Sequence, residues 1–230
     1  MYITMRPRTS LLIALALSGL AGTVSVPEPV DAQGLQAPAP PPPRPRGNLA
    51  PRVRTYTYYI DEGNSADGYH RGDRELATWA LHAWERVSGG TLRFVAAPEA
   101  SPRIRITWVG AREGQYGETV RAPGNRRASI VYIRPDTEAF GPLIAEPARL
   151  DPLLRDSIVY LTCLHELGHA IGLAHTSDER DIMYSFQFGG DIRNYFYRYR
   201  DQIKRREDIA AESGLSANDV ERVRTMFAGR

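Results

Sequence analysis

The sequence has few cysteines and little net charge, and both shortages limit what the protein can be. Cys163 is the single cysteine among 230 residues, so the chain cannot build an internal disulfide framework and cysteine pairing does not reveal its compartment. The 29 basic and 27 acidic residues leave a formal net charge of +2, which is too small to indicate a nucleic-acid partner. Histidine is also scarce, with five copies, of which His70 and His82 stand apart and are expected at the surface. Clues to function therefore have to come from local sites.

The N-terminal segment has the layout of an export signal. Arg6 and Arg8 precede an apolar run over residues 11–20, and small residues follow, which is typical of a secretory signal peptide. The run is short for a membrane span, which needs about 20 apolar residues, although an uncleaved N-terminal anchor stays open as an alternative. We expect residues 1–32 to be the signal and the protein to be exported, either secreted or periplasmic.

Residues 33–51 form a second segment, in which proline dominates from Pro38 to Pro45. Such a composition favours extended polyproline II and cannot pack as a helix or a central strand. We interpret this segment as a stiff linker between the export signal and one folded domain over residues 52–230, a length that suits a single domain.

Strand-like patterns recur through the first half of that domain. Tyrosine and threonine dominate residues 54–60, and apolar residues alternate with polar ones over 91–95 and 103–108, which is typical of half-buried strands. A further strand is expected over 128–133. Residues 110–127 are rich in glycine and charge, and we expect a long loop there that could contain a short strand.

Helical spacing of apolar residues predicts three main helices. A surface helix is expected over 73–87, and the most hydrophobic helical segment covers 151–174. Ser216 and Asp219 form a capping-box pattern that announces a C-terminal helix. Because strands and helices interleave, the predicted fold class is α+β, a small mixed twisted sheet with a long central helix.

Three of the five histidines fall within the window 165–175. His165 and His169 are four residues apart, so a helix turns about 400° between them and both imidazoles project from one face. Glu166 lies on the flank of that face, where it can reach a water on a metal without taking a ligand position. His175 can return to the same metal only if the helix ends first, and Gly172 can adopt the positive φ that such a turn needs.

This constellation predicts a catalytic zinc site. Three neutral imidazoles, from His165, His169 and His175, leave a fourth position of one tetrahedral zinc ion open, unlike a closed structural site. Glu166 would act as general base on the zinc-bound water and pass the proton to the leaving amine. The sequence thus predicts a zinc metalloendopeptidase, a hydrolase acting on protein or peptide substrates. The alternative is a catalytically silent binding domain with the same fold and zinc, but such a domain has no need of Glu166.

Residues 165–175 read HELGHAIGLAH and match the zinc signature HExxHxxGxxH of the metzincins. The following Asp-Ile-Met-Tyr at 181–184 resembles the methionine turn of the matrixins, the matrix metalloproteinase branch. The resemblance implies a matrixin-like catalytic domain in which Met183 packs beneath the metal ligands without binding the metal and Tyr184 supports the same turn. We expect the substrate to lie antiparallel to an edge strand of the sheet.

The sequence departs from the matrixin pattern in two segments. Residues 110–136 contain no histidine, so no second, structural zinc is expected. Asp136 and Glu138 could bind calcium, but two carboxylates are a weak signal and solvated loop charges are the favoured interpretation. Residues 184–186 lack the proline that shapes the matrixin specificity pocket, so substrate preference does not carry over.

Two further features lie beside the zinc motif. Cys163 is two residues before His165, about 200° around the helix, and is expected to be a buried thiol and not a switch that keeps the enzyme latent. Residues 186–214 have no recognised matrixin counterpart and are treated as an insertion. We interpret 193–206 as a helical segment that packs its aromatic side on the domain. A contact between its cations and an anionic surface or the substrate is the alternative.

Overall fold

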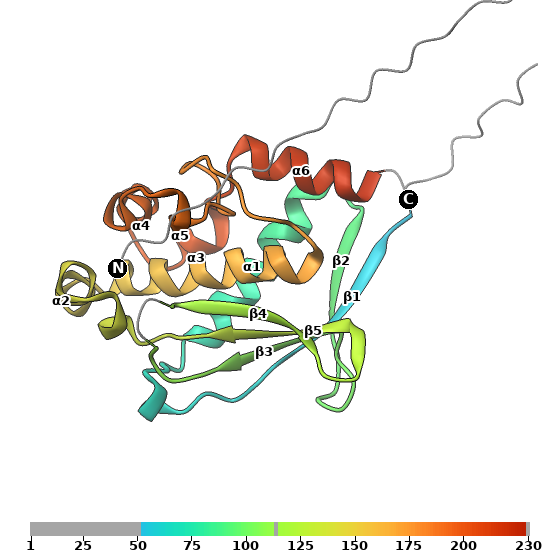
Figure 1. The fold of residues 1–230 in the computed structure, drawn as a ribbon, viewed down its shortest axis with the longest axis horizontal. Coiled ribbons are helices and arrows are strands. Elements are labelled where there is room, and N and C mark those ends of the chain that lie inside the picture. Colours follow the sequence, from blue (N-terminus) through green and yellow to red (C-terminus); the bar gives the residue numbers. More distant parts are fainter. Residues whose placement is uncertain (1–51, 113–114, 229–230) are drawn as a thin grey trace, which may run out of the picture. The chain divides into compact units, whose positions relative to one another are not determined.

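The computed structural model describes residues 52–112 and 115–228, which fold around one mixed β-sheet (Figure 1). The strands have the order β2-β1-β3-β5-β4. Their bounds are β1 Arg54–Ile60, β2 Leu92–Ala96, β3 Ile104–Trp108, β4 Gly117–Ala122 and β5 Asn125–Ile133. Each neighbouring pair runs parallel except β4 and β5, which are antiparallel. The predicted signal peptide and proline-rich linker lie outside the described residues.

Four of the strands were predicted, β2 and β3 from the alternation of apolar and polar side chains and β1 from its composition. In β3, Ile104, Ile106 and Trp108 are buried and the residues between them are partly exposed. In β1, Tyr56 and Ile60 are buried. These apolar side chains join the core that the sheet shares with the helices. The strand β4 lies within the segment expected to be a long loop that could contain a short strand, and it forms one edge of the sheet.

The helices gather on one side of the sheet, with α3 directly against it (Figure 1). Their bounds are α1 Asp73–Val87, α2 Pro142–Leu150, α3 Pro152–Ile171, α4 Ile192–Arg200, α5 Asp208–Ala211 and α6 Ala217–Ala228. Short 3-10 turns cover Ser65–Asp67, Thr137–Phe140 and Phe186–Phe188. The helix α2 was not predicted. In the described part of the chain, no helix has the length and apolarity needed to cross a membrane.

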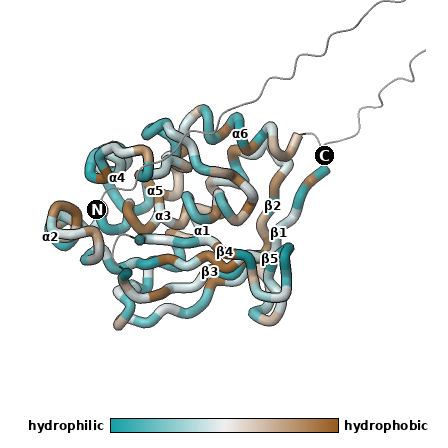
Figure 2. The backbone as a smooth tube through the Cα atoms, in the orientation of Figure 1, coloured by the Kyte–Doolittle hydropathy of each residue, from teal (hydrophilic) through white to brown (hydrophobic). Residues whose placement is uncertain are grey.

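The helix α3 is the centre of the core, because 16 of its 20 residues are buried. Hydrophobic positions recur along it and along the central strands (Figure 2). Asp151 caps its N-terminus by accepting hydrogen bonds from the backbone N–H groups of Leu153 and Leu154. The buried indole of Trp84 in α1 donates a hydrogen bond of 2.9 Å to the backbone oxygen of Leu164. Cys163 is fully buried, as expected.

The C-terminal helix begins with the predicted capping box. The backbone N–H of Ser216 donates to the Asp219 carboxylate, and the backbone N–H of Asp219 donates to the Ser216 hydroxyl, each at 3.0 Å. Both N–H groups would otherwise lack a helical partner. Strands and helices interleave along the chain, so the α+β class is confirmed. The helix α1 lies near the N-terminus of the domain, α3 in the centre and α6 at the end.

The segment over residues 186–214, predicted to be an insertion, forms α4 and α5 and packs its aromatic side on the domain. Tyr195, Phe196 and Tyr199 are buried. Several of its cations have partners within the domain, since Arg200 donates to Asp151 and Arg206 donates to Asp156. These contacts agree with the packing interpretation, whereas an anionic-surface contact stays a prediction.

His70 and His82 are exposed, as expected.

Candidate metal centre and active site

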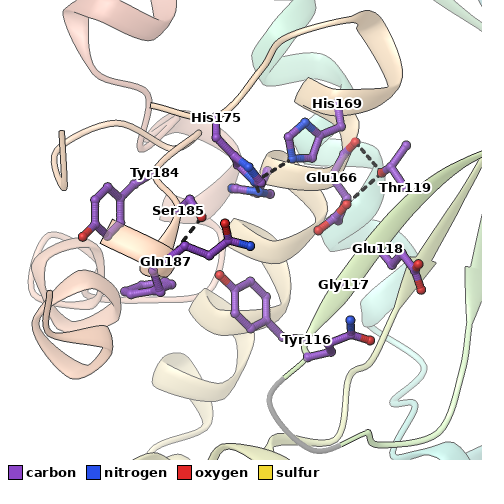
Figure 3. Close-up of a pocket in the computed structure, with 13 residues that line it drawn as sticks. Tyr116, Gly117, Glu118, Thr119, Glu166, His169, His175, Tyr184, Ser185 and Gln187 are labelled. Carbon is purple, nitrogen blue, oxygen red and sulfur yellow. Dashed lines mark hydrogen bonds between the residues drawn. The ribbon is translucent and has the colours of Figure 1, made fainter. Parts of the chain in front are cut away.

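The three histidines of the motif come together at the C-terminal end of α3 (Figure 3). The Nε2 atom of His175 lies 3.3 Å from that of His165 and 3.0 Å from that of His169. A tetrahedral zinc ion with bonds of about 2.0–2.1 Å holds two imidazole nitrogens about 3.3 Å apart. The donor set and its spacing therefore fit one zinc ion. Among the described residues, these three form the one histidine, cysteine or carboxylate group of this kind.

Gly172 ends α3 and makes this convergence possible. Its φ of 112° lies in the left-handed region, and its backbone N–H donates to the backbone oxygens of Gly168 and His169. The chain leaves the helix axis at this turn and returns with His175. The helix thus ends where the spacing between the second and third histidines requires a break.

Backbone carbonyl groups orient two of the imidazoles. His165 Nδ1 lies 2.7 Å from the backbone oxygen of Ile182, and His169 Nδ1 lies 2.9 Å from that of Leu173. A carbonyl oxygen can only accept, so each Nδ1 carries the hydrogen and each Nε2 lone pair faces the shared point. Burial, with His169 nearby, lowers the pKa of His165 to about 3, and burial also lowers the pKa of His169. The rings are therefore in the neutral form that metals bind.

Glu166 faces the same cavity from α3 and is 4% exposed. The Thr119 hydroxyl in β4 lies 2.8 Å from Glu166 Oε2. Burial raises the pKa of Glu166 to about 7, the contact with Thr119 acts in the opposite direction, and the charge of Glu118 adds to the rise. A carboxyl group with a pKa near neutrality is suited to accept and return a proton.

The cavity has a volume of about 360 Å³ and lies between β4, α3 and the turn after Met183. It is lined by residues 115–119, by His165, Glu166, His169 and His175, and by residues 184–187. Sequence reasoning missed the contribution of 115–119, because these residues match no motif and fall in the segment expected to be a loop. Tyr116 packs there against Phe140, Phe186 and Phe196.

Met183 and Tyr184 lie in a turn beside the histidines. Met183 is fully buried, and its sulfur packs against Gly168 of α3. The backbone N–H of Thr176 donates to the Met183 oxygen at 2.9 Å, which ties the turn to the residue after His175. The Tyr184 hydroxyl donates to the backbone oxygen of Gly189 and points away from His175 (Figure 3). Both side chains therefore support the turn without reaching the shared point of the histidines.

The two carboxylates considered for calcium have partners within the protein. Asp136 accepts a hydrogen bond from the backbone N–H of Glu138, and Glu138 forms an ion pair with Arg149 at 2.9 Å. These contacts account for both side chains as ordinary loop charges. Calcium binding is therefore not supported by their arrangement, and the expected lack of a second zinc stays a prediction.

A mixed sheet beside a helix that carries two of three converging histidines defines a domain of the metzincin class. The chain belongs to the matrixin family, since the Matrixin family model matches residues 51–195. It is 28% identical to matrix metalloproteinase-17 of Homo sapiens in an alignment of 178 residues that covers 74% of this chain. The chain spans only 27% of that relative's length.

Two solved structures are also similar to this chain. The GM1-bound form of the ECX AB5 holotoxin aligns with a TM-score of 0.49 and 19% identity, covering 76% of this chain and 80% of that chain. Myroilysin aligns with a TM-score of 0.33 and 16% identity, covering 74% of this chain and 72% of that chain. Both TM-scores are low, so neither similarity adds to the family assignment.

Proposed function

We propose that the protein is a zinc-dependent endopeptidase that hydrolyses peptide bonds in protein substrates. The observation that carries this proposal is the convergence of three Nε2 atoms in a cavity that also holds the Glu166 carboxyl group. Membership of the matrixin family supports the same reaction class. Zinc is the metal that fits the donor set, because imidazole nitrogens at tetrahedral spacing are typical of its catalytic sites.

The residues divide into two roles. His165, His169 and His175 would hold one zinc ion through Nε2, with the hydrogen bonds at Nδ1 keeping the first two rings in place. When bound, zinc polarises the scissile carbonyl group and makes water easier to deprotonate. Glu166 accepts the proton of the attacking water and returns it to the leaving amine, so the reaction needs no covalent intermediate with the protein.

The edge strand β4 offers a place for the substrate. Its hydrogen-bonded neighbour in the sheet is β5, and residues 117–119 border the cavity. An extended peptide could add to the open edge as an antiparallel strand, with main-chain hydrogen bonds setting its register. Such a peptide would pass the histidines and Glu166 within the same cavity. The aromatic side chains of Tyr116 and Phe186 would then contact the substrate on one side.

Export belongs to the proposal as well, because the charged and apolar order of residues 1–32 favours it. Expression of the full chain in a bacterial host followed by fractionation measures this directly. We expect the chain outside the cytoplasm and shortened at its N-terminus. Full-length protein retained in the cytoplasm would contradict the export part of the proposal and leave the peptidase part open to its own test.

Hydrolysis of casein or gelatin by the zinc-loaded full chain tests the activity. Glu166→Gln is the matched variant, because it keeps the size of the side chain and removes its ability to accept the proton. We expect equal zinc content and a rate that is lower by about 10²–10⁴-fold. A chelator should abolish the wild-type activity and added zinc should restore it. Equal activity of the two proteins at equal zinc content would reject the proposal.

A further inference from the structure

Two residues of β4, Thr119 and Gly117, lie beside Glu166, and Figure 3 shows the hydrogen bonds between Thr119 and Glu166. The Thr119 hydroxyl lies 2.8 Å from Glu166 Oε2 and 2.9 Å from the backbone oxygen of Glu166. Gly117 comes two residues earlier, on the same face of the strand. A Cβ atom at Gly117 would lie 2.6 Å from Glu166 Cγ and 2.7 Å from Oε1. The Glu166 side chain therefore occupies space that exists only because residue 117 is glycine.

We propose that Thr119 is a positioning residue for Glu166 and that Gly117 provides the room in which the Glu166 side chain is held. The edge strand then has two tasks, because it binds the extended substrate and fixes the place of the base relative to it. This inference rests on the proposed peptidase function, in which Glu166 handles the proton. It concerns residues 117 and 119, which no sequence motif marks.

The chemistry of a hydroxyl group explains why threonine suits this position. A hydroxyl carries one donor hydrogen and two acceptor lone pairs. While Glu166 is a carboxylate, Thr119 can donate to Oε2. Once Glu166 has accepted a proton, the carboxylic acid can donate to Thr119 Oγ1, and Thr119 can donate to the Glu166 backbone oxygen, which is also within reach. One side chain thus holds the base in both of its protonation states.

Steady-state kinetics of the zinc-loaded full chain separate positioning from a general structural role. Thr119→Val keeps the shape and removes the hydroxyl, and we expect kcat to fall by about 10- to 100-fold while KM and zinc content stay unchanged. Thr119→Ser restores the hydroxyl and should bring kcat to within about threefold of the wild type. Gly117→Ala should displace Glu166 and lower kcat by about 10²-fold.

Val95→Thr is the matched control, because it uses the same two residue types at an exposed position of β2, the strand at the opposite edge of the sheet from β4. We expect its kcat and KM to equal those of the wild type. Two results would overturn the inference: Thr119→Val with wild-type kcat, or Thr119→Ser as impaired as Thr119→Val at equal zinc content.

An NMR measurement reads the contact without relying on activity. In the zinc-loaded wild type, an α-proton of Gly117 should give a nuclear Overhauser effect to the γ-protons of Glu166, because a Cβ atom in that proton's direction would lie 2.6 Å from Glu166 Cγ. The signal should persist in Thr119→Ser and weaken in Thr119→Val. Its absence from the wild type would overturn the inference. If the wild type cleaves no more than Glu166→Gln, the proposed function fails, and this signal alone then decides whether β4 holds Glu166.

Discussion

Replacing Gly168 by alanine tests how tightly the methionine turn packs against the zinc-motif helix. Gly168 lies inside α3, one residue before His169. An added Cβ atom would lie 2.3 Å from Met183 Sδ and 3.2 Å from Trp84 Cζ2. Ordinary contacts between such atoms are about 3.5–4.0 Å. Met183 and Trp84 are both fully buried, so neither has free space into which it can move.

Two opposing effects set the size of the change. Alanine is favoured over glycine inside a helix by about 1 kcal/mol. Overpacking a closed core costs about 1–3 kcal/mol. Because the Met183 contact is so short, we expect overpacking to win and Gly168→Ala to lower the free energy of unfolding by up to about 2 kcal/mol. Met183→Ala itself costs about 2–5 kcal/mol, but it removes the blocking sulfur. In that background, Gly168→Ala should be neutral or stabilising.

Urea unfolding, followed by tryptophan fluorescence, measures all four proteins of this double-mutant cycle. The free zinc concentration must be held constant, because zinc bound to the folded state adds stability by mass action. We expect a coupling energy between Gly168→Ala and Met183→Ala of about 1–3 kcal/mol. If Gly168→Ala destabilises the protein equally in both backgrounds, the contact with Met183 is not the cause and the reasoning is refuted.

Two further predictions concern the N-terminal ends of α3 and α1. Burial alone would raise the pKa of Asp151, but the hydrogen bonds from Arg200 and from the α3 backbone outweigh it and lower the pKa below 3.8. The stabilisation from Asp151 is therefore present above its unfolded-state pKa and is lost as the pH falls through the lowered folded-state value. We expect Asp151→Ala to cost about 1 kcal/mol at neutral pH in urea unfolding, and a difference that persisted in strong acid would contradict this. Arg155→Met leaves the buried carboxylate of Asp73 without its ion pair. It should cost about 3–5 kcal/mol, and adding Asp73→Asn should recover part of that loss, so a double variant less stable than Arg155→Met would count against the ion-pair argument.

Several parts of the fold could be predicted because burial leaves a periodic trace in the sequence. The helix α1 was predicted with its observed bounds, since its apolar residues recur at helical spacing and two glycines follow it. In the site, the i, i+4 spacing of His165 and His169 determines their shared face. The position of Gly172 was informative for a similar reason, because a positive φ is a property that few other residues tolerate.

Two elements leave no such trace: the helix α2, which was not predicted, and β4, which was expected only as a possible short strand within a long loop. All residues of β4 except Arg121 are of intermediate burial, so neither face of this strand selects for apolar side chains. Apolar and polar residues therefore do not alternate clearly along its sequence. Its register comes from pairing with β5 and from contact with α3, which are long-range effects. The helix α2 begins at Pro142 and contains Pro147, and prolines at such spacing favour a loop in any reading of the sequence alone. Thr119 and Gly117 went unnoticed because they lie in β4.

The orientation of the imidazoles could not be predicted for a different reason. The acceptors that fix His165 and His169 are the backbone oxygens of Ile182 and Leu173, and every residue has such an oxygen. The motif therefore identifies the ligand residues but not the nitrogen that each one presents. It also follows that changing the side chain of residue 182 or 173 leaves the acceptor in place unless the backbone moves. Met183 directly follows Ile182, so a substitution that displaced Met183 would also move the Ile182 backbone oxygen. If Gly168→Ala shifts the turn in this way, zinc affinity should fall together with stability, and it should recover in the Met183→Ala background.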